Sequence, residues 1–532
     1  MADTAARFRA LAEDAVTDLL QLDPESATYL GDHRWDDRLD DLSDAGRVEA
    51  AATLADHRDE LDSLDADELE PADAVDAEIL RAGLDRRLFE LEQLREHSWN
   101  PLLWLPGDAL YLLLVRDTGP VPDRLRALAG RLDAVPDRLA LARATLRDMP
   151  RVHVETALTQ TSGVLGLVRD QVPALLAREP GLGGVLDGPR QHAADALEQF
   201  RDWLLDQLED AAGDPRLGPG LFAAKLHLTL DADLSADRIT AAARDHLDAV
   251  TAQLTELAAG WVGGGDDPVR RAFARVAAET PDDGTIVALA RQALADTTEL
   301  VTRSGILRVP DDPVEIEVMP EFRRGIAVAY CDAPGPLEAG GTTRFAISPT
   351  PAGWSPERVA SFYREYNTAL VTDLTVHEAM PGHVLQLALA RRYRGSTAIR
   401  QVLASDSFIE GWACHAEEIM AGLGCGGVPV HLQQLKMQLR STINALLDAG
   451  VHAGGMSEAE AMALMADRGY QEEGEAAGKW RRALLTSTQL STYFVGYHEL
   501  RPVVAGRDSY DDVLAHGSPP PRHLPALLAA AD

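Results

Sequence analysis

The residues best suited to chemistry lie in one short segment, HEAMPGH, which spans residues 377–383. It offers two imidazole rings, His377 and His383, and one carboxylate, Glu378, directly after the first ring. Neutral imidazole nitrogen is a common zinc ligand, and a glutamate beside such a ligand acts as general base in many metallopeptidases. The segment therefore predicts a zinc site in which Glu378 activates water.

The spacing of the two histidines is unusual for a zinc-binding helix. The second histidine commonly follows four residues after the first, so that both rings share one helix face. Here six residues separate them, and at about 100° per residue a regular helix would place the rings about 120° apart. Pro381 and Gly382 are expected to break the helix and bring the rings together. Alternatively, Pro-Gly simply ends a helix and both histidines are ordinary polar residues.

A catalytic zinc ion usually has three protein ligands and one water, so a further ligand is needed. Glu410 and Glu417, in the segment EGWACHAE, are seven residues apart and share a helix face. Two carboxylates on one face of an otherwise apolar helix are costly unless they are paired or bind a cation. We expect Glu410 to be the third ligand and Glu417 to orient a ligand imidazole. Asp373, one turn before His377, is a second candidate for orienting a ligand imidazole. The alternative for the two glutamates is a solvated acidic face of the helix.

Motifs along nearly the whole chain resemble those of a bacterial family called domain of unknown function 885. The family's HEAxPGHxxQ corresponds to residues 377–386, and its EGWxxYxE corresponds to residues 410–417. Its DTGLH resembles DAGVH at 448–452, its QAxSYxxG resembles QLSTYFVG at 489–496, and its N-terminal motif resembles DPESATYLG at 23–31. Five motifs in the family's order are far more specific than any one of them.

The family is similar to gluzincin peptidases, which have long helical bodies and a deep channel. The resemblance implies a zinc ion held by His377, His383 and Glu410. By the same analogy, His452 and Tyr493 would face the channel and stabilise the oxyanion of a tetrahedral intermediate. Each of these two residues has an alternative role as a packed residue of the core.

Four positions depart from the family's pattern. Val384 stands where a second histidine often follows, His415 replaces a tyrosine, Asn444 replaces an arginine and Phe494 replaces a lysine. The metal residues are kept, whereas positions expected to contact the substrate differ. The leading prediction is therefore hydrolysis of an amide bond in a small peptide or small-molecule amide. A specialised non-peptide amide, ester or C–N bond in a metabolic pathway is one alternative, and a non-catalytic helical scaffold is another.

The elements that must position these residues are mainly helical. Apolar residues recur at three- and four-residue spacing from about residue 5 to 260 and again from 355 to about 500, whereas residues 314–318, 324–330 and 343–347 follow a strand pattern. We expect a mainly α fold with an N-terminal helical lobe over residues 1–262. A catalytic lobe over residues 263–532 would place a small sheet, at about 313–348, before the metal-binding helix, and both lobes would form one integrated unit.

Composition limits the partners and the compartment. The chain carries 85 acidic and 50 basic residues, a net charge of −35, which disfavours nucleic acid and anionic lipid as partners. Its three cysteines are too few and scattered for a disulfide framework. The N-terminus has no apolar signal segment, and no apolar run approaches a membrane span. The sequence therefore predicts a cytoplasmic protein without a membrane partner, and it leaves the oligomeric state open.

Overall fold

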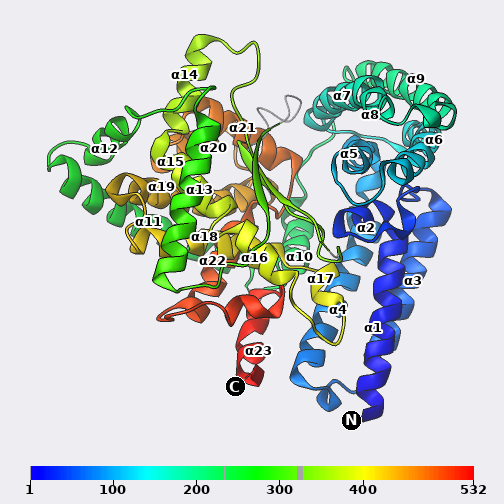
Figure 1. Cartoon of the computed structure of the whole chain (residues 1–532), viewed down its shortest axis with the longest axis horizontal. Coiled ribbons are helices and arrows are strands. Elements are labelled where there is room, and N and C mark those ends of the chain that lie inside the picture. The colour runs from blue at the N-terminus through cyan, green and yellow to red at the C-terminus, as the bar shows by residue number, and fades with distance from the viewer. Residues whose placement is uncertain (1, 233, 320–327, 339, 532) are drawn as a thin grey trace. The chain divides into compact units, whose positions relative to one another are not determined.

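The computed structural model describes residues 2–232, 234–319, 328–338 and 340–531. Helices make up most of these residues, and the strands form one small sheet, so the predicted mainly α fold is confirmed (Figure 1). The chain divides into two compact units.

Unit 1 comprises Met1–Pro215 and two later segments, Pro334–Gly341 and Gly395–Leu403. Much of its core lies between α6 and α9, which pack against each other through buried side chains such as Leu132 and Phe200. Its α-helices are α1 (Ala2–Leu22), α2 (Pro24–Leu30), α3 (Asp44–Asp62), α4 (Pro71–Phe89), α5 (Gly107–Val115), α6 (Val121–Thr145), α7 (Arg151–Gly166), α8 (Val172–Leu176), α9 (Gly183–Gln207) and α17 (Ile399–Val402). Its short 3-10 and π-helical turns are η1 (His33–Trp35), η2 (Ala66–Glu68), η3 (Glu90–Leu94), η4 (Glu96–Ser98), η5 (Pro101–Trp104), η6 (Leu167–Gln171) and η7 (Pro180–Leu182).

A buried ion pair joins one late segment to the first half of unit 1. The Arg400 guanidinium, on α17, donates to Asp76 of α4 at 2.6 Å, and both side chains are 1% exposed. The Thr397 hydroxyl donates to the other oxygen of Asp76 at 2.6 Å. These bonds explain why residues far apart in the sequence belong to one compact body.

Unit 2 comprises Arg216–Ala333, Thr342–Arg394 and Ala404–Asp532. Its α-helices are α10 (Gly218–Leu230), α11 (Ala236–Val262), α12 (Pro268–Val276), α13 (Ile286–Ser304), α14 (Pro356–Glu365), α15 (Thr368–Glu378), α16 (His383–Ala390), α18 (Asp406–Gly422), α19 (Gly427–His452), α20 (Glu458–Ala463), α21 (Glu473–Leu485), α22 (Ser491–Val504) and α23 (Leu524–Ala531). Short turns of helix follow at η9 (Leu464–Arg468), η10 (Val513–His516) and η11 (Pro521–His523).

The units divide at Pro215, earlier than the predicted lobe boundary after residue 262. The reason is the packing of α11, whose buried residues Leu247, Val250 and Leu254 share one core with Leu439 and Ile443 of α19. The glycines at 263–265 form only the turn between α11 and α12, two helices that pack against each other. Glycine-rich composition at that point therefore marks a turn within a unit.

The small sheet precedes α15, the helix predicted to carry a metal ligand, as the sequence predicts. Strands β1 (Val314–Val318) and β3 (Thr343–Ile347) run parallel, and β2 (Ala329–Asp332) pairs antiparallel with β3, which gives the order β1-β3-β2. The first and third strands have the predicted bounds, whereas residues 324–327 of the remaining predicted strand lie outside the described residues. Helix α13 runs beside β1 and β3 (Figure 1), and Phe345 and Ile347 of β3 share a core with Val371 of α15.

Candidate metal centre

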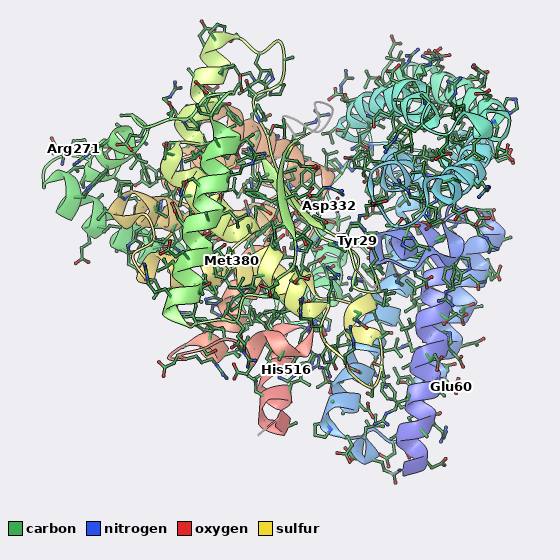
Figure 2. All side chains as sticks on the ribbon, viewed as in Figure 1. Tyr29, Glu60, Arg271, Asp332, Met380 and His516 are labelled. Carbon is green, nitrogen blue, oxygen red and sulfur yellow. The ribbon has the colours of Figure 1, made fainter. Side chains whose placement is uncertain are left out.

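The predicted helix break is present between α15, which ends at Glu378, and α16, which begins at His383. The peptide between Met380 and Pro381 is cis, and the Gly382 amide donates to the Val376 carbonyl at 3.0 Å. A Cβ atom on Gly382 would lie 1.7 Å from the His377 carbonyl oxygen, so a larger residue does not fit this turn. Met380, labelled in Figure 2, is buried in the turn.

A tryptophan on a different helix stabilises the break. The indole nitrogen of Trp412, on α18, donates to the Pro381 carbonyl at 2.9 Å, and the Trp412 side chain is fully buried. This bond satisfies a carbonyl that the break removes from the helical hydrogen-bond pattern. Because Glu410 lies two residues before Trp412, the same helix that stabilises the turn also supplies a carboxylate to the histidines.

The break brings both histidine rings to one carboxylate oxygen. The ring centroids of His377 and His383 are 4.8 Å apart, with the ring planes at 88°. The Nε2 atom of His377 lies 3.5 Å from Oε2 of Glu410, and the Nε2 atom of His383 lies 3.6 Å from the same oxygen. The structure thus gathers all three predicted ligands, and their ligand atoms lie within 4.8 Å of one another.

These distances fit a metal ion better than they fit hydrogen bonds. Ligand atoms about 2.0–2.2 Å from a tetrahedral zinc ion lie roughly 3.3–3.6 Å from one another, which matches both distances to Glu410. The Oε2 atom of Glu410 and the Nδ1 atom of His383 are buried without a hydrogen-bond partner in the part of the chain that the structure describes. Burial opposes ionisation of Glu410, but the two rings hold the pKa of this carboxyl well below its usual range. The buried, ionised oxygen between two imidazoles suits a cation.

Glu417 lies where an orienting partner of His377 is expected. Its Oε1 is 2.6 Å from Nδ1 of His377, the ring nitrogen that does not face Glu410, and its side chain is 2% exposed. A carboxylate in this place fixes the ring's orientation and tautomer. Although burial opposes protonation of the ring, the contacts with Glu410 and Glu417 raise the pKa of His377 well above its usual value.

Asp373 shares the buried space around Glu417. Its side chain is 1% exposed, and its Oδ2 atom has no hydrogen-bond partner among the described residues. Burial and the neighbouring Glu417 carboxylate raise the pKa of Asp373 well above its usual value, although His377 acts in the opposite direction. The structure therefore brings together Asp373, Glu417 and the three predicted ligands in one buried group.

A second group of possible ligand atoms overlaps the first. It consists of His377, Cys414 and Glu417, and all three side chains are buried. The thiolate is the form of cysteine that binds metals, yet burial and the nearby carboxylates of Glu417 and Glu410 raise the pKa of Cys414 well above its usual value. Glu417 also already bonds to His377. The group with Glu410 is therefore the better metal site.

Glu378 ends helix α15 and is half-buried beside the sheet. Burial raises the pKa of the Cys331 thiol on strand β2, and the Glu378 carboxylate contributes to that rise. Helix α15 also packs against β2. The predicted base thus lies between a ligand histidine and an edge strand of the sheet.

Two glycines bring Tyr493 close to the three predicted ligands, His377, His383 and Glu410, which are called the metal group below. Helices α18 and α22 cross at Gly411 and Gly496, where an added Cβ on Gly411 would lie 2.4 Å from the Gly496 backbone. Glu410 directly precedes this crossing on α18, and Tyr493 lies one turn before it on α22. Burial and the Glu410 carboxylate raise the pKa of Tyr493. Sequence reasoning missed the structural roles of Gly411 and Trp412, although both stand inside the EGW motif and therefore had a visible signal.

His452 does not join this group. Its Nε2 atom lies 2.9 Å from the Ala483 carbonyl and 2.8 Å from the Thr486 carbonyl, so this nitrogen donates to backbone oxygens. The ring stacks on Phe222 and is 2% exposed. These contacts are those of a residue that packs α19 against the end of α21.

The positions that depart from the family's pattern are packed in the interior. Val384 and Phe494 lie in the two hydrophobic cores of unit 2, and Asn444 is buried on α19. His415 is buried, stacks on Tyr497 and bonds to that residue's carbonyl at 2.9 Å. All four side chains therefore belong to the packed interior, and none of them is a predicted metal ligand.

Comparison with known proteins agrees with the motif resemblance. Residues 24–528 match the family model described as Bacterial protein of unknown function (DUF885). The chain belongs to this DUF885 family. None of the curated proteins matches the sequence.

Two solved structures share this fold. A protein described as a putative lipoprotein of unknown function from Shewanella oneidensis is 25% identical, with a TM-score of 0.82 over 98% of this chain and 99% of that one. A protein described as a putative lipoprotein from Colwellia psychrerythraea is 14% identical, with a TM-score of 0.79 over 99% of this chain and 98% of that one. An M32 carboxypeptidase from Deinococcus radiodurans R1 aligns with a TM-score of only 0.39 at 10% identity, which is too low to support an argument.

The predicted cytoplasmic location is wrong in the light of these structures, because the two that align over nearly the whole chain come from proteins described as putative lipoproteins. The prediction relied on the absence of an apolar signal segment, which says little about how a family is distributed among compartments. Among the helices that the structure describes, none is long and apolar enough to cross a membrane.

Proposed function

We propose that this DUF885 protein is a zinc-dependent hydrolase that cleaves an amide bond in a peptide or a small peptide-like molecule. The observation that carries the proposal is the shared approach of His377 and His383 to one buried oxygen of Glu410. Two neutral nitrogens and one carboxylate oxygen are a common ligand set of catalytic zinc, which keeps its fourth position for water or substrate. The position of Glu417 behind His377 supports the same assignment.

Each protein group has a defined part in this chemistry. When bound, a zinc ion supplies a Lewis acid that polarises a carbonyl and makes water acidic enough to lose a proton near neutral pH. Glu378 accepts that proton and returns it to the nitrogen of the leaving amine, since it directly follows a ligand on the same helix. Glu417, which is hydrogen-bonded to Nδ1 of His377, keeps the ring oriented, and Asp373 shares the buried space beside Glu417.

Tyr493 is the proposed oxyanion donor. Burial and the neighbouring Glu410 raise its pKa, so the hydroxyl keeps its proton and can donate a hydrogen bond to a developing negative charge. The Arg482 guanidinium lies 3.2 Å from the Tyr493 oxygen and makes the hydroxyl a stronger donor. His452 has no such role in this proposal, because its Nε2 proton is already shared by two carbonyls.

The test uses Glu378→Gln in the full chain. This variant should retain stoichiometric zinc, since Glu378 is not a ligand, and should lose about 100-fold or more of the turnover that a general base supplies. Zinc content by atomic emission and cleavage of a peptide library by mass spectrometry are the two readouts. Glu299→Gln, at an exposed glutamate of α13, is the matched control. Wild-type activity in Glu378→Gln would refute the assigned base.

A further inference from the structure

A group of charged side chains lies on α14, α19 and α21, helices that carry none of the three predicted metal ligands. Glu365 accepts from Lys436 at 2.9 Å and from Arg440 at 3.2 Å. Glu475 accepts from Arg440 at 2.5 Å and from the Tyr366 hydroxyl at 3.1 Å. These contacts satisfy both carboxylates and neutralise the two cations of α19.

Two further cations of this group form no ion pair with a carboxylate of the described residues, although Glu475 lies near enough to Lys479 to affect its pKa. Lys479 and Arg482 follow Glu475 on the same face of α21, at four and seven residues. Neither side chain forms an ion pair with any residue that the structure describes, and both are half-buried. In a chain with a net charge of −35 and only three lysines, two unpaired cations on one half-buried helix face are unusual.

The Arg482 guanidinium has donors to spare. One of its terminal nitrogens donates to Gln489 at 2.7 Å and to the Tyr493 hydroxyl at 3.2 Å. The guanidinium carries five N–H donors in a planar fork that matches a carboxylate. The described residues therefore fix the orientation of Arg482 through neutral partners, and none of them forms an ion pair with it.

Tyr493 connects these cations to the metal group. Gln489 contacts both the Arg482 guanidinium and the Tyr493 hydroxyl, so the three side chains form one hydrogen-bonded set. Tyr493 in turn lies one helical turn from the Gly411–Gly496 crossing that places Glu410. Because the Glu410 carboxylate acts on Tyr493 and Arg482 donates to the Tyr493 hydroxyl, a molecule whose amide bond lies at the predicted ligands would have a cation on the side of Tyr493.

We propose that Lys479 and Arg482 bind a free carboxylate of the substrate, so that the substrate class is peptides or peptide-like amides with a carboxylate near the scissile bond. This inference rests on the proposed hydrolase function and specifies its substrate. The carboxylate belongs either to the C-terminus of a peptide or to an acidic side chain. Burial, together with Arg440, lowers the pKa of Lys479 to about 7 despite the opposing effect of Glu475, which a bound anion would relieve.

The experiment compares matched substrates of the zinc-loaded full chain. N-acetylated tripeptides are prepared with a free C-terminal carboxylate or a C-terminal amide, and each is made with glutamate or glutamine beside the scissile bond. Removing a carboxylate that a charged group binds should raise KM about 10-fold or more. The form of peptide that shows this preference identifies which source of carboxylate is bound.

Variants connect the preference to these two residues. Lys479→Met and Arg482→Met keep apolar stems but remove the charge, and each should raise KM about 10-fold for the carboxylate substrate. Lys479→Met should leave the amide substrate unchanged, whereas Arg482→Met should also lower kcat for both substrates because Arg482 donates to the Tyr493 hydroxyl. Lys479→Arg should retain the preference. Arg481→Met removes an exposed charge from the same helix and is the matched control.

Binding separates failure of this inference from failure of the proposed function. Calorimetry with the Glu378→Gln protein measures the affinity of the same acid and amide tripeptides without turnover. Tighter binding of the acid that is lost in the Lys479 and Arg482 variants would support the carboxylate site even if no peptide is cleaved. Equal affinity and equal KM for acid and amide, or a preference that both variants retain, would overturn the inference.

Discussion

The contact between Glu417 and His377 gives the sharpest test of how the metal group is held. We consider Glu417→Gln, which keeps the size of the side chain and a carbonyl acceptor but removes the negative charge. The Nδ1–Oε1 distance is 2.6 Å and both side chains are buried, so solvent does not screen the lost charge. A neutral amide makes a weaker bond to the ring and leaves Nε2 a weaker zinc ligand.

The expected magnitude follows from the same contact. Loss of an orienting partner of a ligand histidine typically lowers metal affinity about 10- to 100-fold, which corresponds to about 1.4–2.7 kcal/mol. We expect the upper half of this range, because the bond is short and buried. The fold should be unaffected in the presence of zinc, since the amide still fills the space of the carboxylate.

The assay is competition for zinc against a chromogenic chelator, with wild type, Glu417→Gln and Glu418→Gln measured side by side. Glu418 is the next residue of α18, but its carboxylate accepts from the Tyr497 hydroxyl at 2.8 Å and does not contact a predicted ligand. We expect Glu418→Gln to bind zinc as wild type does. Equal zinc affinity in all three proteins would refute the assignment of His377 as a ligand through Nε2.

Two other predictions concern pH and stability. Burial opposes protonation of His377, but Glu410 and Glu417 raise its pKa, so a proton competes with zinc for the ring. The zinc affinity should therefore rise with pH up to that pKa and fall about tenfold per pH unit below it. Competition titrations that show no pH dependence in acid would contradict this prediction. Asp76→Asn leaves the Arg400 charge buried without its partner and should destabilise unit 1 by about 3–5 kcal/mol in denaturant unfolding. Glu198→Gln, in the exposed pair with Arg169, should cost less than about 1 kcal/mol, and equal losses in both variants would contradict the reasoning.

Periodicity and motif spacing predict much of the fold and of the metal group. The two strands at 314–318 and 343–347 match the structure, in which Val314 and Ile316 of β1 pack against the core that contains Phe345 and Ile347 of β3. The break at Pro381 and Gly382 was predictable because six-residue spacing cannot bring two rings together on a regular helix. Glu410 and Glu417 were found because seven residues place both on one face of α18.

Other features depend on contacts between distant segments. The Gly263–Gly265 stretch reads as a lobe boundary, yet the packing of α11 on α19 decides which unit α11 joins. Likewise, Lys479 and Arg482 look like ordinary surface cations in the sequence. The structure shows that Glu365 and Glu475 pair with Arg440, and only this shows that Lys479 and Arg482 form no ion pair with those carboxylates. His452 resembles a family motif residue, and only the carbonyls of Ala483 and Thr486 reveal its packing role.

The central claim is that His377, His383 and Glu410 hold one zinc ion. Anomalous diffraction collected on both sides of the zinc absorption edge, from crystals of the zinc-loaded full chain, tests it most directly. We predict one anomalous peak about 2.0–2.2 Å from Nε2 of His377, Nε2 of His383 and Oε2 of Glu410. A peak between His377, Cys414 and Glu417, or no peak within unit 2 at full zinc loading, would contradict the account.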